Sequence, residues 1–144
     1  MMPISGFDDD DRNRGSRVGN PIIYNMPAAA SYTGNQTYTV ADVMGGIIVH
    51  DATGNVTGTF PSAAALVKAF QILGSIPAVG DVVYLLLTNG ANAAGTITIS
   101  LGTGGSFDAN QGGGSRVVPF AQSKTLLIRL TNITPGSEGY IVYS

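Results

Sequence analysis

The chain has 144 residues, a length typical of one domain that buries roughly 70% of the surface of its unfolded chain. Its net charge of −2 argues against nucleic acid as the main partner, because phosphate binding needs clustered Lys and Arg. The lack of cysteine excludes disulfides, thiolate zinc sites and cysteine nucleophiles. No apolar run reaches the ~18 residues of a membrane-spanning helix, so no membrane association is expected.

Charged residues are few, at 11% of the chain, and they are unevenly distributed. Seven of the sixteen lie in the first twenty positions (Asp8 to Asp11, Arg12, Arg14 and Arg17), so the remaining 124 residues carry only nine. A soluble monomer normally keeps more charge on its surface. We therefore expect an assembly in which neighbouring molecules cover much of the surface.

Residues 1–35 differ from the rest of the chain. They show no hydrophobic periodicity and mix Gly, Pro, Asn and both kinds of charge, as an extended arm does. Two alternatives remain open here: a disordered tail, or a tether that becomes ordered on a neighbouring subunit. In the second case the spaced apolar side chains are the expected anchors: Ile4, Phe7, Ile22, Ile23 and Tyr24.

Residues 36–144 are expected to form the folded domain. Short runs at 37–40, 47–50 and 56–59 predict strands separated by Gly- and Asn-containing turns. The one convincing helix begins at Pro61, and it is predicted to end near Gly74 after about three turns. Its apolar residues fall at helical spacing on one face: Ala63, Leu66, Val67 and Phe70.

The second half of the chain continues the strand pattern. Residues 82–88 are apolar at almost every position, which predicts a central strand buried on both faces. Residues 96–101 alternate strictly between polar and apolar, as a half-buried strand does. Pro119 cannot donate to a strand ladder, so residues 117–120 should form an edge strand. The predicted fold class is all-β: an antiparallel, jelly-roll-like β-sandwich with one short helix and an extended N-terminal arm.

A hairpin is predicted to close the domain. Residues 125–131 and 139–143 read as strands, and Pro135-Gly136 between them suits the centre of a type II turn. If Asn132 faces Ser137, one side of the hairpin is a core face and the other is about half apolar. The second side should be covered by a partner, and its expected oligomer-interface residues are Leu127, Arg129, Tyr140 and Val142. In that register Arg129 lies opposite Tyr140, which would allow a cation–π contact.

No catalytic, cofactor or metal site is predicted. His50 is the only histidine, and Asp51 beside it points to the opposite side of the strand, so a Ser-His-Asp arrangement is disfavoured. Scattered carboxylates with one His do not match metal-ligand clusters, and most of these acids lie at turns. Glycan binding has weak support, because Trp is absent and only Tyr32, Tyr38 and Phe107 are offered as aromatic platforms.

A set of turn and strand motifs carries a family resemblance. The segment 42–49 (DVMGGIIV) is followed by Phe60-Pro61-Ser62-Ala63 and then by the helix. Further motifs are Gly80-Asp81, Thr88-Asn89, Thr96-Ile97-Thr98, Gly102-Thr103-Gly104, Leu130-Thr131-Asn132-Ile133 and Gly136-Ser137-Glu138. Over residues 37–143 this pattern resembles the short β-sandwich proteins on virions of large double-stranded DNA viruses and tailed phages. These serve as minor capsid, cement, decoration or fibre-base proteins, commonly as trimers.

The resemblance implies a non-enzymatic structural protein located in the virion. Its expected partners are two further copies, in a homotrimer, and other capsid proteins. The family has no catalytic residues to transfer. The alternative interpretation is a receptor- or glycan-binding module of a viral fibre or spike, which would use its loop tips instead of its arm and flank.

Overall fold

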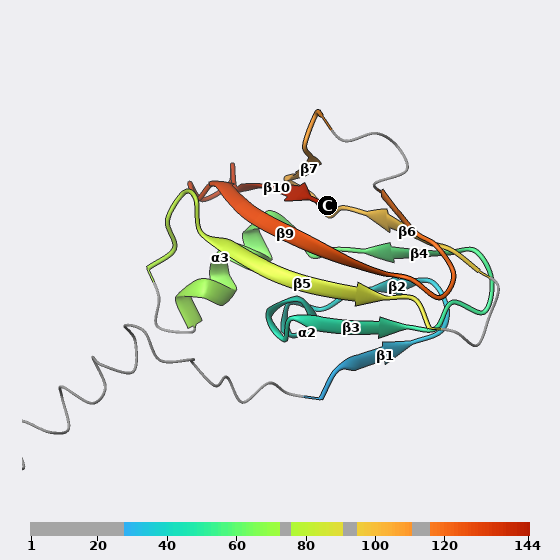
Figure 1. Ribbon diagram of the computed structural model, residues 1–144. Coiled ribbons are helices and arrows are strands. Elements are labelled where there is room, and N and C mark those ends of the chain that lie inside the picture. Colours follow the sequence, from blue (N-terminus) through green and yellow to red (C-terminus); the bar gives the residue numbers. More distant parts are fainter. Residues whose placement is uncertain (1–27, 73–75, 91–94, 111–115) are drawn as a thin grey trace, which may run out of the picture.

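A computed structural model describes residues 28–72, 76–90, 95–110 and 116–144, which form ten strands and two helices (Figure 1). The strands are β1 (Ala30–Tyr32), β2 (Gln36–Thr37), β3 (Ile47–His50), β4 (Val56–Thr59), β5 (Val82–Thr88), β6 (Ile97–Ser100), β7 (Gly105–Phe107), β8 (Val117–Val118), β9 (Ser123–Asn132) and β10 (Gly139–Tyr143). The helices are α2 (Val40–Met44) and α3 (Ala63–Ile72).

The strands form two sheets around one core, which confirms the β-sandwich. One sheet has six strands in the order β1-β3-β5-β9-β10-β7, and the other has four in the order β2-β4-β6-β8. The long strands β5 and β9 run side by side through the six-stranded sheet, and α3 lies at the end of the sandwich where β5 begins (Figure 1).

The predicted antiparallel pairing is wrong for most of the ladders. Five of the eight strand pairings are parallel, and the three antiparallel ones are β5-β9, β9-β10 and β6-β8. From β1 to β9 the chain changes sheet at every strand. From β1 to β6 it returns to each sheet running in the same direction, which makes β1-β3-β5 and β2-β4-β6 parallel series. Strands β8 and β9 enter their sheets in the opposite direction. The jelly-roll-like part of the prediction, which presumes antiparallel neighbours, is not confirmed.

The core consists of the inward side chains of both sheets. Strand β9 contributes Leu126, Ile128 and Leu130, while β6 contributes Ile97 and Ile99, all at most 3% exposed. The alternation predicted for residues 96–101 is confirmed, since Thr98 between the two isoleucines is exposed. Strand β8 lies at the edge of the four-stranded sheet, as Pro119 indicated.

A buried amide joins the ends of several strands. The Asn89 side chain is 1% exposed, and its Oδ1 accepts a hydrogen bond from the Ala52 amide. Its Nδ2 donates to the carbonyl oxygens of Gly95 and Val118. These contacts pair three backbone groups at the ends of β3, β6 and β8, which satisfies the polar groups of that part of the core.

Helix α3 confirms the helical prediction. Ala63, Leu66 and Val67 are buried, and Phe70 packs against the core from a partly buried position. The helix is found at 63–72, and the predicted end near Gly74 lies outside the described residues.

Helix α2 was missed, because residues 37–40 were predicted as strand and 42–46 as a turn. Thr39 caps the helix: its Oγ1 accepts from the Asp42 amide, while the Asp42 carboxylate accepts from the Thr39 amide. This is a capping box, whose sequence signature is an N-cap Thr followed three positions later by an acidic side chain. The fold also begins before residue 36, since β1 pairs in parallel with β3.

Candidate functional site

The outward side of the six-stranded sheet is the candidate site. Its side chains alternate with fully buried ones along each strand, so they point away from the core. We call this surface the outer face, and its central residues are Ile47, Val49, Val82, Tyr84, Leu86, Leu127, Arg129, Ile141 and Tyr143. Tyr84 is 67% exposed and Val82 is 37% exposed. Nothing in the described part of the chain covers Tyr84.

Strand register arranges these side chains in rows. Leu127 pairs with Tyr84 on one side and with Tyr143 on the other. In the next row, Arg129 pairs with both Val82 and Ile141. Cross-strand neighbours of this kind are close enough to contact one another. The rows therefore form a continuous surface that is apolar except at Arg129.

Arg129 is the only charged residue of the outer face. Within the described ranges it makes no ion pair and no hydrogen bond through its side chain. Its guanidinium lies beside Gly80, in the loop that leads into β5. The Gly80 amide donates to the Leu130 carbonyl at 2.9 Å, which holds this loop against the end of β9. The same loop carries an exposed apolar side chain, since Val79 is 59% exposed.

Two of the four predicted interface residues are misplaced. Leu127 and Arg129 lie on the outer face, but Tyr140 and Val142 are fully buried in the core. The cause is a β-bulge: Gly139 pairs with Asn132, whereas Tyr140 pairs with Leu130. A shift of one residue turns every following side chain of a strand to the opposite face.

Burial of Tyr140 also removes the predicted cation–π contact with Arg129. The Tyr140 hydroxyl donates instead to the Pro61 carbonyl at 3.0 Å, and burial raises the pKa of Tyr140 to about 12. A cation–π contact is present elsewhere, with the Arg116 guanidinium 4.5 Å from the centre of the Phe107 ring. Both Tyr140 and Val142 therefore act in the fold and not in the outer face.

The prediction that residues 82–88 are buried on both faces is likewise wrong for the single chain. Leu85 and Leu87 are fully buried, but the side chains that alternate with them point outward. The apolar character of this strand on both sides is real, and the described part of the chain buries only one of them. The sequence therefore indicated the outer face through the apolar residues on both sides of strand β5.

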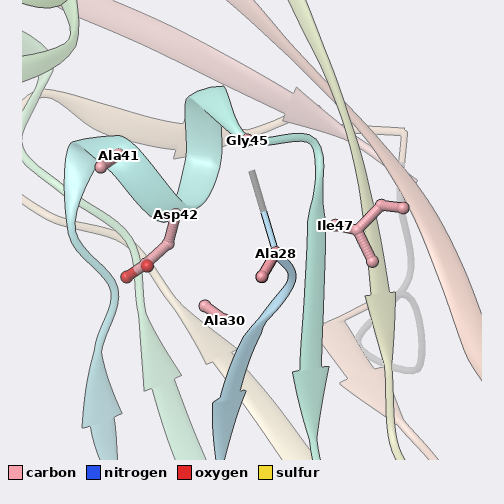
Figure 2. Close-up of a pocket in the computed structure, with 6 residues that line it drawn as sticks. All are labelled: Ala28, Ala30, Ala41, Asp42, Gly45 and Ile47. Atoms are coloured by element: carbon pink, nitrogen blue, oxygen red, sulfur yellow. The ribbon is translucent and has the colours of Figure 1, made fainter. Parts of the chain in front are cut away.

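A small pocket lies where the chain enters β1. It has a volume of about 120 Å³ and lies between β1, helix α2 and β3 (Figure 2). Its lining is mostly small and apolar: Ala28, Ala30, Ala41, Asp42, Gly45 and Ile47. The Asp42 carboxylate already accepts from the Tyr32 hydroxyl at 2.8 Å and from the Thr39 amide at 2.6 Å. The one charged side chain of the lining is thus engaged in the helix cap and with Tyr32.

The single histidine is part of a buried aromatic cluster. His50 Nε2 lies 2.7 Å from the Gly34 carbonyl oxygen, which can only accept, so this nitrogen carries the proton. The Tyr38 hydroxyl then donates to Nδ1 at 2.8 Å. Burial lowers the pKa of His50, while it raises the pKa of Tyr38. The Tyr38 ring packs edge-on against Phe60, which joins the cluster to the core.

The predicted glycan platform has no support in this geometry. Tyr38 is 1% exposed, Tyr32 is partly buried against the core, and Phe107 is covered by Arg116. In the described ranges, no three His, Cys, Asp or Glu side chains come together as a metal site, and no helix is long and apolar enough to cross a membrane.

The predicted arm anchors Ile4, Phe7, Ile22, Ile23 and Tyr24 lie outside the described residues, and their role stays a prediction. Comparisons of the chain with models of known protein families, with curated protein sequences and with solved structures found no match.

Proposed function

We propose that this protein is a non-enzymatic structural subunit of a virus particle, a minor capsid or decoration protein that assembles through the outer face. The observation that carries the proposal is the exposed apolar surface around Tyr84, on a sheet whose other side is the domain core. The largest apolar patch on a soluble domain is often a site that binds a partner. A structural role needs no reactive group, which agrees with the polar contacts of His50 and Asp42 inside the fold.

The proposed assembly is a homotrimer on the capsid surface or between capsomers, in contact with other capsid proteins. A closed ring covers an apolar surface on every copy, whereas an open contact would continue into fibres. The choice of three copies and of a virion rests on the resemblance of residues 37–143 to viral decoration proteins. The N-terminal arm belongs to the same proposal, as the element that attaches the domain to its neighbours.

Light scattering on the purified full-length chain tests the assembly. We expect the mass of three subunits at micromolar concentration. Leu127→Asp places a charge in the middle row of the outer face and should yield monomers, since an unpaired charge in a packed interface is costly. Thr98→Asp is the matched control, because Thr98 is exposed on the other sheet and should leave the trimer intact. A monomeric wild-type chain would contradict the proposal.

The virion assignment needs a separate experiment. Particles produced without this protein should lack density at defined surface positions, and adding the purified chain should restore it. Leu127→Asp should fail to restore that density, whereas Thr98→Asp should succeed. Particles that are identical with and without the gene would contradict the virion role and leave the oligomer to be explained differently.

A further inference from the structure

We propose that the outer face is covered by the N-terminal segment, residues 1–27, of a neighbouring copy. This inference rests on the proposed assembly and names the segment that makes the contact. Three observations favour this occupant over a second outer face: the charge on the surface, its area, and the place where the described chain begins.

Charge is the first reason. Arg129 lies in the row between Val82 and Ile141, and none of the residues that form the outer face is acidic. Two outer faces packed together would bury both guanidinium groups without a carboxylate, which is strongly unfavourable. The N-terminal segment carries four consecutive carboxylates, Asp8 to Asp11, followed by three arginines at 12, 14 and 17. One carboxylate of the acidic run is enough to supply the missing partner of Arg129.

Area is the second reason. Four strands about 4.8 Å apart, with up to seven residues at about 3.3 Å each, give the outer face roughly 400 Å². A stable protein interface buries about 800 Å² on each partner, so a direct pairing of two outer faces supplies only about half of this area. A chain segment that wraps the face and the adjoining loop, which carries the exposed Val79, buries more than a flat contact can.

The place where the described chain begins is the third reason. Ala28 precedes β1, the edge strand beside β3, so the segment leaves the domain at the border of the outer face. Twenty-seven residues can span up to roughly 90 Å when extended, which is ample to reach another subunit. In an extended segment Ile22 and Tyr24 point to the same side, as the apolar rows of the outer face require.

Cysteine cross-linking tests this arrangement directly, because the natural chain contains no cysteine. One full-length chain carries Ile22→Cys, and another carries Thr125→Cys, an exposed position of the outer face that pairs with Leu86. The two are co-expressed, oxidised and analysed by mass spectrometry of linked peptides. We expect an interchain disulfide between positions 22 and 125, at least about tenfold more abundant than the linkage formed with the control Thr98→Cys.

The outcomes separate this inference from the proposed function. If the wild-type chain is an oligomer but positions 22 and 125 do not link, the inference is overturned and the assembly stands. A third full-length chain carries both Ile22→Cys and Thr125→Cys. If the disulfide forms only within this chain, the segment covers its own domain, and binding to a neighbouring copy is refuted. A monomeric wild-type chain overturns both the proposed assembly and the proposed contact between the N-terminal segment and a neighbouring copy.

Discussion

Leu85 and Leu86 are adjacent on β5 and face opposite sides of the six-stranded sheet, which makes them a matched pair of probes. Leu85 is fully buried, whereas Leu86 lies on the outer face opposite Ile47 and Thr125. Replacing Leu85 with Ala removes three carbon atoms from the core. At about 0.8 kcal/mol for each, the transfer term is about 2.4 kcal/mol, and the cavity brings the usual loss to about 2–5 kcal/mol.

Leu86→Ala removes the same atoms from a surface that the described chain leaves partly open. Leu86 is itself partly buried, so in the separated subunit we expect a loss smaller than that of Leu85→Ala, about 1–2 kcal/mol. Urea unfolding followed by circular dichroism measures both variants, and measurement at two protein concentrations separates the fold from the assembly. The Leu85→Ala loss should be independent of concentration. The Leu86→Ala loss should grow where wild-type subunits associate.

Two results would refute this reasoning. A loss below about 1 kcal/mol for Leu85→Ala would mean that β5 does not face the core in this register. An equal and concentration-independent loss for both variants would mean that the domain itself buries both sides of β5. The second result would remove the outer face as a binding surface.

Three further predictions concern the fold. A Cβ at Gly58 would overlap the buried Tyr38 ring, so Gly58→Ala should lower the free energy of unfolding by about 1–3 kcal/mol in urea titrations. Asn89→Ala leaves buried backbone groups without partners, and should cost at least about 1–3 kcal/mol by the same measurement. Because burial lowers the pKa of His50 below that of the unfolded chain, the unfolded state binds more protons below about pH 6.5. Stability should therefore be fully present above pH 7 and should fall as the pH drops through that range, by at most about 1.4 kcal/mol per pH unit, and His50→Gln should remove this slope.

Local patterns predicted the elements that depend on local physics. Strict alternation in residues 96–101 and helical spacing from Ala63 to Phe70 each identify one buried side, and the structure has both. The turn at Pro135-Gly136 was also predictable, since Gly136 has a φ of 83° and the Ser137 amide donates to the Thr134 carbonyl. The capping box at Thr39 and Asp42 was equally visible in the sequence, but a strand prediction for residues 37–40 concealed it.

Pairing between distant strands could not be predicted in the same way. A strand that alternates polar and apolar side chains looks the same in a parallel and in an antiparallel ladder, so the winding of the chain between two sheets left no local trace. The bulge before Tyr140 is a second example. Both registers of β10 offer an apolar row, Tyr140 and Val142 or Ile141 and Tyr143. The buried hydrogen bond from Tyr140 to Pro61, 79 positions away, accompanies the first arrangement.

The positions of the few carboxylates have a structural explanation. Four of the five carboxylates after residue 28 accept a backbone hydrogen bond in their own turn or cap: Asp42, Asp81, Asp108 and Glu138. These acids stabilise local turns, so they do not contribute charge to the sheet surfaces. The outer face is consequently left with one cation and no anion, while the densest group of carboxylates lies at positions 8–11. An apolar surface with a single cation and a segment with a run of four carboxylates are complementary at that one point. Such a contact is what the proposed binding of residues 1–27 to the outer face of a neighbouring copy requires.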